Sequence, residues 1–172
     1  DDVVSGVCGI NHNGRVFGAI ETAQCVGDRR IVEGHLTGSA IVVSASGDEV
    51  LLLHHRKLDR WLQPGGHVEN DPSLIDAAKR ELTEEIGFTA ARWHPLGAIM
   101  PVPAYSDEII HLYRAEALLP ARQQLDADEI LDVHEFHYGE ALEMIRTGKI
   151  RDAKTIAGLM MAQAGAVNPL PR

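Results

Sequence analysis

The 172-residue chain is poor in aromatic residues, in cysteine and in basic residues. Its two cysteines, Cys8 and Cys25, do not form a CxxC pair, which argues against a disulfide scaffold and against a structural zinc site. None of its apolar runs approaches the roughly 18 residues that span a bilayer. No signal-peptide pattern is visible, so we expect a protein of the reducing cytoplasm.

Basic residues are outnumbered by acidic ones: 16 Lys and Arg against 25 Asp and Glu give a formal net charge of −9. A surface of this charge repels phosphates, which argues against a nucleic-acid partner and against an anionic-membrane partner. A phosphorylated small molecule would need a cation in order to approach it. Because 45% of the residues are hydrophobic, the chain can bury a core. Its length predicts one domain over residues 1–172.

Strand-like and helix-like segments follow one another without strict alternation. Runs rich in Val, Ile and Leu predict strands, and Ser46–Asp48 predicts a hairpin turn between two of them. Such an order predicts an α/β or α+β fold with a sheet sandwiched between helices. The predicted strands are Arg15–Glu21, Arg30–Glu33, Ser39–Ser44, Glu49–His54, Ile109–Ala117 and Leu131–Phe136, and the predicted closing helices are Gly139–Arg146 and Ala153–Ala164.

A central helix is predicted after a Pro/Gly loop at residues 63–67. Asp71 is suited to cap this helix, Pro72 to its first turn and Gly87 to the position just after its end. Its apolar residues recur at helical spacing and are expected to face the core. They are Ile75, Ala78, Leu82 and Ile86.

Three carboxylates fall within one turn of the same helix. Glu81, Glu84 and Glu85 are at i, i+3 and i+4, so they share one face and repel one another by a few tenths of a kcal/mol per exposed pair. One interpretation is an ordinary solvated helix face. The other is a site for a hard divalent cation, which binds through a few carboxylates and then holds substrate phosphates.

Two neighbouring features favour the metal site. The Gly65-Gly66 pair before the helix lets the backbone approach a metal or a phosphate closely. Arg80 is placed to orient an adjacent carboxylate through its fork of N–H donors. The fixed order of these residues makes a merely solvated face the weaker interpretation.

The segment from Gly66 to Phe88 resembles the signature of the Nudix hydrolase family. That pattern is a Gly, five residues, a Glu, seven residues, Arg-Glu, an aliphatic residue, any residue, Glu-Glu, any residue, a Gly and a bulky apolar residue. Pro72 stands where the pattern has its first Glu, and Glu69 or Asp71 is placed to compensate. The matching residues are Gly66, Arg80, Glu81, Leu82, Glu84, Glu85, Gly87 and Phe88.

The resemblance implies the Nudix fold, in which a mixed β-sheet is sandwiched between α-helices. It also implies Mg²⁺ or Mn²⁺ held by Glu81, Glu84 and Glu85, with help from the backbone of Gly66, and a catalytic contribution from Arg80 and Glu85. The family's chemistry is the hydrolysis of a nucleoside diphosphate linked to another moiety, with a metal that lowers the pKa of the attacking water. Such a metal would supply the positive charge that this acidic chain lacks.

Segments beyond this signature resemble the ADP-ribose pyrophosphatase branch of the family. Pro103 stands about where that branch has a marker proline, and the acidic stretch Asp126–Glu129 resembles the loop that supplies its catalytic base. Glu129, with Asp128 as the next choice, is therefore the expected base. The segment 1–38 resembles leading strands that exchange across a dimer in relatives, which implies a homodimer.

Substrate contacts are expected from four further residues. Arg56 and Arg60 belong to the basic cluster and are candidates for binding substrate phosphates; the alternative is an exposed loop. Tyr105 is a candidate for stacking an adenine, although large aromatic residues more often belong to a core. Glu108 either hydrogen-bonds the substrate or caps a loop.

The first hypothesis is metal-dependent hydrolysis of ADP-ribose to AMP and ribose 5-phosphate. A second keeps the enzyme but changes the substrate to a nucleotide sugar, NADH or a dinucleoside polyphosphate. A third is a Nudix-fold module that binds a ligand without catalysis. Pro72 favours this last hypothesis, whereas the intact set of glutamates and the acidic stretch argue against it. No nucleic-acid or membrane partner is expected.

Overall fold

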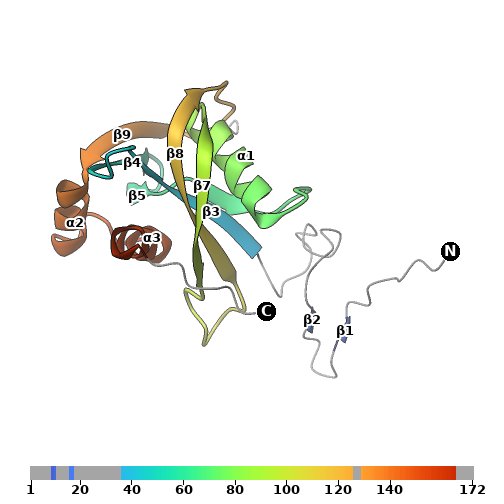
Figure 1. Ribbon diagram of the computed structural model, residues 1–172. Coiled ribbons are helices and arrows are strands. Elements are labelled where there is room, and N and C mark those ends of the chain that lie inside the picture. The colour runs from blue at the N-terminus through green and yellow to red at the C-terminus, as the bar shows by residue number, and fades with distance from the viewer. Residues whose placement is uncertain (1–8, 11–15, 18–35, 126–128, 166–172) are drawn as a thin grey trace.

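The structure is a computed structural model that describes residues 9–10, 16–17, 36–125 and 129–165. Its main sheet has seven strands in the order β5-β4-β3-β8-β7, with β6 also paired to β3 and β9 to β4 (Figure 1). β3 and β8 run parallel and the remaining pairs are antiparallel, so the sheet is mixed, as predicted. The strands are β3 (Leu36–Val43), β4 (Glu49–His55), β5 (Arg60–Leu62), β6 (Gly65–His67), β7 (Phe88–Ile99), β8 (Ile109–Pro120) and β9 (Leu131–His137).

Helices cover both faces of this sheet. Figure 1 shows α1 (Leu74–Ile86) on one face, and α2 (Tyr138–Arg146) and α3 (Ala153–Ala164) on the other. Because successive side chains of a strand point to opposite faces, β3 contributes to two cores. Its Ala40 and Val42 pack in the cluster that includes Leu82 of α1, whereas its Ile41 packs in the cluster that includes Leu159 of α3.

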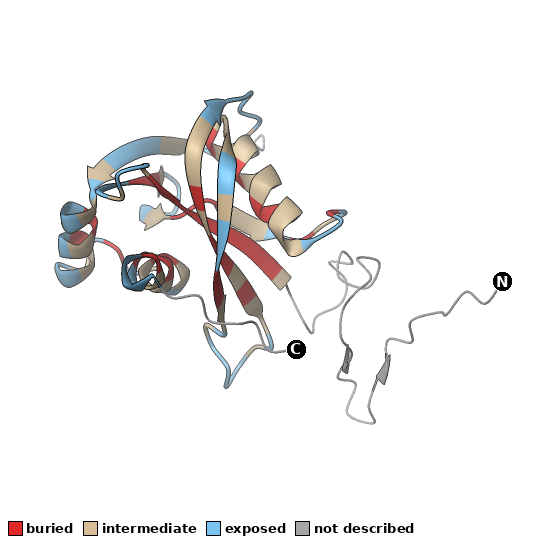
Figure 2. Cartoon of the chain, in the orientation of Figure 1, coloured by how far each residue is buried: buried red, intermediate tan, exposed pale blue. Residues whose placement is uncertain are grey.

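Burial follows these layers. The buried residues line the centre of the sheet and the inner sides of the helices, as Figure 2 shows. The predicted sandwich of a sheet between helices is confirmed.

Several predicted elements are found nearly as expected. The turn at 46–48 joins β3 to β4, with Gly47 at φ +83° and its N–H donating to the carbonyl of Ser44 at 3.0 Å. α3 has the predicted bounds, and α2, β4 and β9 differ from prediction by one residue at one end. β8 extends three residues beyond the predicted Ile109–Ala117, to Pro120.

Four of the described strands were not predicted: the two-residue β1 (Gly9–Ile10), β5, β6 and β7. β7 carries Pro95 and Gly97, which interrupt its pattern, and its register against β8 shifts between these two residues. It forms because β8 supplies a long partner, which local propensity does not reveal. The short β5 and β6 flank the predicted Pro/Gly loop, and β6 overlaps its second half at Gly65–His67.

The start of α1 corrects the prediction. The capping residue is Ser73, whose side chain accepts the N–H of Asp76, so the helix begins later than expected and Pro72 lies outside it. Asp71 binds Arg80 instead. Ile75 is only partly buried, while Ala78 faces the core as predicted. Gly87 ends the helix in the left-handed conformation at φ +72°, as predicted.

The N-terminal predictions lie largely outside the described residues. Arg30–Glu33 is not described, and of Arg15–Glu21 only β2 (Val16–Phe17) is, paired antiparallel with β1 (Gly9–Ile10). Among the described helices, none combines the length and the apolar character that crossing a membrane requires.

Candidate active site

A cavity of about 550 Å³ opens beside the C-terminal half of α1. Side chains and backbone reach it from strand β6 and the loop that follows it (together the β6 turn), from α1 and from the chain between β8 and β9. The cavity therefore brings together segments that are up to about 60 residues apart in the sequence. Its lining consists of Gly65, Gly66, His67, Glu69, Arg80, Glu81, Glu84, Glu85, Gln124, Leu125 and Glu129.

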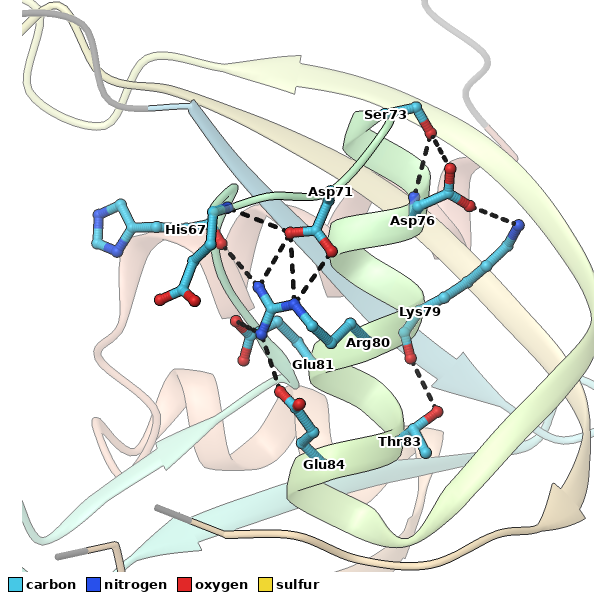
Figure 3. A network of polar contacts seen from close by, with 10 residues as sticks. His67, Asp71, Ser73, Asp76, Lys79, Arg80, Glu81, Thr83 and Glu84 are labelled. Atoms are coloured by element: carbon cyan, nitrogen blue, oxygen red, sulfur yellow. Dashed lines mark hydrogen bonds and ion pairs between the residues drawn. The ribbon is translucent and has the colours of Figure 1, made fainter. Parts of the chain in front are cut away.

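Arg80 ties the carboxylates of this region together (Figure 3). Its Nη1 lies 2.8 Å from Oε2 of Glu84 and 2.9 Å from Oε1 of Glu81. Its Nη2 donates to the carbonyl of His67 at 3.0 Å, which joins the helix to the β6 turn. One guanidinium thus orients two of the three predicted metal ligands.

Asp71 occupies the remaining side of the guanidinium. Its Oδ1 accepts Nε of Arg80 at 3.0 Å and its Oδ2 accepts Nη2 at 3.1 Å, a two-point contact that a planar guanidinium forms well. Its side chain is only 8% exposed. Asp71 also accepts the backbone N–H of Glu69 at 3.2 Å. The carboxylate missing at Pro72 is thus replaced, one residue earlier, by a side chain that pairs with Arg80.

Glu85 is the carboxylate with the most unusual environment. Burial, together with the nearby charges of Glu81 and Glu129, raises its pKa to about 8. Two groups oppose this shift: the N–H of Gly65, which donates to Oε2 of Glu85 at 2.8 Å, and the charge of Lys154. A buried carboxylate with raised pKa in a cavity is the kind of group that a bound cation would stabilise.

Glu81 lies against the backbone of Gly66. A Cβ at Gly66 would stand 2.4 Å from Oε1 of Glu81, so any other residue there would displace the carboxylate. Burial raises the pKa of Glu81, and the charges of Glu84 and Glu129 add to this shift, whereas Arg80 opposes it. The backbone of the turn and the carboxylate thus meet at one point of the cavity.

The chain after β8 is fastened to the end of α1. Carbonyls in the last turn of a helix lack partners within the helix. Here Gln124 N–H donates to the carbonyl of Glu84 at 3.0 Å, and the side-chain Nε2 of Gln123 donates to the carbonyl of Glu85 at 2.7 Å. These bonds hold the segment that leads to Glu129 beside the cavity.

Glu129 is held from its other side as well. The carbonyl of the next residue, Ile130, accepts the N–H of Arg56 at 3.0 Å, just before β9 begins. Glu129 lines the cavity and is close enough to Glu81 and Glu85 to raise the pKa of both. The structure therefore brings the expected base to the expected ligands.

The donor set of the cavity fits a hard divalent cation. Carboxylates and a backbone carbonyl are the oxygen ligands that Mg²⁺ and Mn²⁺ prefer, and burial first, with neighbouring carboxylates second, raises the pKa values of Glu81 and Glu85. Within the described ranges no three acidic, His or Cys side chains already converge as a ligand group.

The four predicted substrate contacts do not line this cavity. Arg56 pairs with Asp132, with Nη2 to Oδ1 at 2.8 Å. Arg60 donates to the carbonyl of Asp59, and Tyr105 is 93% exposed. Glu108 accepts the hydroxyl of Thr37 at 3.0 Å. Asp128 lies outside the described residues.

Some members of the site were not predicted from the sequence. His67, Gln124 and Leu125 line the cavity only because the fold brings their segments to α1. The contact of Lys154 is equally tertiary, since its Nζ donates to the carbonyl of Gly65 at 3.2 Å from a distant helix. Among the contacts missed, only the pairing of Asp71 with Arg80 joins residues close in the sequence, on either side of the start of α1.

Comparison with known proteins agrees with this layout. A family model for the NUDIX domain matches residues 34–159. An ADP-ribose pyrophosphatase from Bacillus subtilis is 31% identical over 140 residues, covering 78% of this chain and 76% of that protein. A GDP-mannose pyrophosphatase from Escherichia coli is 28% identical over 141 residues, covering 74% of each. A methanol dehydrogenase activator from Bacillus methanolicus is 28% identical over 141 residues, covering 78% and 76%.

Solved structures show the same fold at low sequence identity. An ADP compounds hydrolase superposes with a TM-score of 0.63 at 19% identity, covering 76% of this chain and 72% of that one. A NUDIX hydrolase from Nitrosomonas europaea superposes with a TM-score of 0.65 at 19% identity, covering 80% and 93%.

The matching family model and the pyrophosphatase relatives identify a pyrophosphohydrolase. The chain belongs to the Nudix family, as a Nudix hydrolase related to ADP-ribose and GDP-mannose pyrophosphatases, and this confirms the resemblance found in the sequence. Members of the family generally use divalent metal ions.

Proposed function

We propose that the chain hydrolyses the pyrophosphate bond of ADP-ribose, which with one water yields AMP and ribose 5-phosphate. The observation that carries this proposal is the cavity in which Glu81, Glu84 and Glu85 of α1 face Glu129 of a separate segment. Of the relatives compared, the ADP-ribose pyrophosphatase at 31% identity supports the choice of substrate.

In this proposal Glu81, Glu84 and Glu85, with the carbonyl of Gly66, would hold Mg²⁺ or Mn²⁺. When bound, the metal polarises the pyrophosphate and makes a water molecule more acidic. The protein's own part is to present the carboxylates and to compensate their negative charge until a cation binds. Arg80 does this for Glu81 and Glu84, and the N–H of Gly65 does it for Glu85.

Glu129 would act as the general base. It would take a proton from the attacking water, whose oxygen forms a new bond to phosphorus while the bridging P–O bond breaks. Asp128 stays the next choice for this role. Arg80 would act by orienting Glu84, by pairing with Asp71 and by donating to the carbonyl of His67 in β6.

Arg56, Arg60, Tyr105 and Glu108 stay proposed substrate contacts. Because none of them lines the carboxylate cavity, they would bind parts of the substrate away from the pyrophosphate. Tyr105 has an exposed ring that is able to stack on a base.

We further propose a homodimer involving residues 1–38; a monomeric mass at micromolar concentration would contradict it.

A second candidate substrate is GDP-mannose. Relatives that act on it are 28% identical over 141 residues, close to the value for the ADP-ribose relative. The cavity would bind the pyrophosphate, which both substrates share. Its carboxylates therefore do not discriminate between ADP-ribose and GDP-mannose.

A substrate panel tests the proposal. Purified protein is incubated with ADP-ribose, GDP-mannose, NADH, a dinucleoside polyphosphate and a nucleoside triphosphate, each with Mg²⁺ and with excess chelator, and products are separated by chromatography. We expect AMP and ribose 5-phosphate from ADP-ribose, with Mg²⁺ only. Cleavage of GDP-mannose alone selects the second candidate, and ligand binding without hydrolysis selects the non-catalytic module.

A further inference from the structure

We propose that Lys154, in the first turn of α3, is a positioning residue of the carboxylate cavity: it holds the Gly65–Gly66 turn so that its backbone meets the carboxylates of α1. The side-chain Nζ of Lys154 donates to the carbonyl of Gly65 at 3.2 Å, and the contact is partly buried. It joins residues 89 positions apart in the sequence. This role rests on the proposed function, since it concerns how the same cavity is built.

Gly65 is held from both of its peptide groups. Its N–H donates to Oε2 of Glu85 at 2.8 Å, while its carbonyl accepts Lys154. One residue therefore links a cation of α3 to a carboxylate of α1, across the edge of the sheet. Removing the cation leaves the N–H contact to Glu85 and the pairing of β6 with β3, but no partner for the carbonyl of Gly65 from α3.

The turn depends on such outside contacts because it carries no side chains of its own. Gly65 has φ +146°, and a Cβ there would stand 2.1 Å from the hydroxyl of Ser39. At Gly66 a Cβ would meet Glu81. Glycine is required at Gly65 by its positive φ and by the Ser39 backbone, and glycines have the greatest backbone freedom. The pairing of β6 with β3 restricts the two glycines, and the donor from α3 adds a contact at the carbonyl of Gly65.

The first turn of α3 is itself fixed, so it can serve as an anchor. Asp152 caps the helix by accepting the N–H of Thr155 at 2.8 Å and its hydroxyl at 2.7 Å. The hydroxyl oxygen of Thr155 accepts the N–H of Gln63 at 3.0 Å. Residues 63 and 65 of the turn are therefore each bound to adjacent residues of α3, 155 and 154.

A buried amide completes the frame behind the turn. Gln63 is 1% exposed, and its Nε2 donates to the hydroxyl of Ser39 at 2.8 Å, which in turn donates to the carbonyl of Pro64 at 2.8 Å. A Cβ at Gly158 of α3 would stand 2.3 Å from Oε1 of Gln63, so the helix backbone packs directly on this amide. Residues 63 and 64 are thus held by Thr155 and Ser39, and Lys154 binds the next residue, Gly65.

The experiment compares Lys154→Met with Lys154→Arg and with a matched control, Lys149→Met. Lys149 is exposed and precedes α3, so its replacement removes the same charge from the same region. Binding of Mn²⁺ to metal-free protein is measured from the electron paramagnetic resonance signal of free Mn²⁺. kcat, KM for the accepted substrate and the melting temperature are measured on the same samples.

We expect Lys154→Met to weaken Mn²⁺ binding on the order of 10-fold, because groups that orient metal ligands typically contribute at least that much. kcat should fall by a similar factor while KM and the melting temperature stay near the wild-type values. Lys154→Arg should recover part of the loss, and Lys149→Met should match the wild type.

Contrary results distinguish failure of the proposed role of Lys154 from failure of the proposed function. Wild-type Mn²⁺ binding and kcat in Lys154→Met would overturn the role of Lys154 alone. An equal loss in Lys149→Met would also overturn it, because the effect would then belong to general charge, and so would a loss fully accounted for by unfolding. If the wild-type protein binds no Mn²⁺ and hydrolyses nothing, the proposed function falls, and the role of Lys154 falls with it.

Discussion

The two ends of α1 differ in how their acidic residues are compensated. At the N-terminal end Ser73 caps the helix and the neighbouring acids have partners: Asp76 pairs with Lys79 at 3.2 Å, and Asp71 pairs with Arg80. At the C-terminal end Glu81, Glu84 and Glu85 crowd together, and no basic residue stands in the last turn. Carboxylates are unfavourable there, because that end of the helix dipole is negative.

This difference separates stability from function. The N-terminal end follows the rules that make a helix stable, whereas the C-terminal end violates them beside a cavity. Arg80 lies between the two ends and contacts acids from both. Local violations of this kind are expected at functional sites. The acids of the C-terminal end would be compensated by a bound cation, which is why their removal should affect activity and stability in opposite directions.

The largest effect is expected from Glu85→Gln. It removes a proposed metal ligand, so activity should fall by more than about 100-fold, beyond what the loss of an orienting partner costs. Above pH 8 the metal-free variant should melt at a higher temperature than the wild type, because the buried wild-type carboxylate, whose pKa is raised to about 8, is then charged. Initial rates and melting curves check both. Glu143→Gln, an exposed acid of α2, serves as the control, and full turnover in Glu85→Gln would contradict the assignment.

Arg80→Met breaks the link between the two ends of the helix. It leaves Asp71, which is only 8% exposed, without its cation, and losing one partner of a buried pair costs about 3 kcal/mol of unfolding free energy. Activity should fall by about 10- to 100-fold as Glu84 loses its orientation. Denaturant unfolding and initial rates measure these effects. Arg146→Met, in an exposed pair with Glu143, should change neither by much.

Gly66→Ala tests the close approach at the functional end. The new Cβ would stand 2.4 Å from Oε1 of Glu81, so the carboxylate or the turn must move. We expect activity to fall by about 10-fold, in line with other losses of ligand orientation. Gly139→Ala at α2 is the control, since a Cβ there meets nothing within 4 Å. Equal activity in both variants would show that the approach has no function.

Ser73→Ala changes the N-terminal end only. Loss of the cap should lower the unfolding free energy by about 1 kcal/mol. kcat and KM should stay at wild-type values, because Ser73 does not line the cavity. Thermal unfolding and steady-state kinetics check this. A large loss of activity without loss of stability would contradict the separation of the two ends.

Much of this arrangement follows from local sequence, but the cap does not. Asp71 and Ser73 are both good capping residues, and nothing local decides between them. The choice is made by Arg80, which engages Asp71 and leaves Ser73 to cap. Gly87, by contrast, was predictable because a left-handed residue at a helix end favours glycine.

Non-local contacts explain what else was missed. β7 depends on β8 for its existence and has Pro95 and Gly97 within it. The contact of Lys154 with Gly65 exists only once α3 has packed against the sheet. The carboxylates of α1 were found because a single helical turn places them together, whereas the approach of Glu129 to them is a tertiary contact that local spacing does not predict.

The central claim is that the C-terminal end of α1 binds a divalent cation, and thermal unfolding with and without Mg²⁺ tests it most directly. Chelator-treated protein is melted in buffer alone and with Mg²⁺ at about 100 times its dissociation constant, where a ligand specific to the folded state adds about 2.7 kcal/mol. We predict a clear rise in the melting temperature for the wild type and for Glu143→Gln, and little or none for Glu85→Gln. An unchanged wild-type melting temperature, or an equal rise in Glu85→Gln, would contradict the claim.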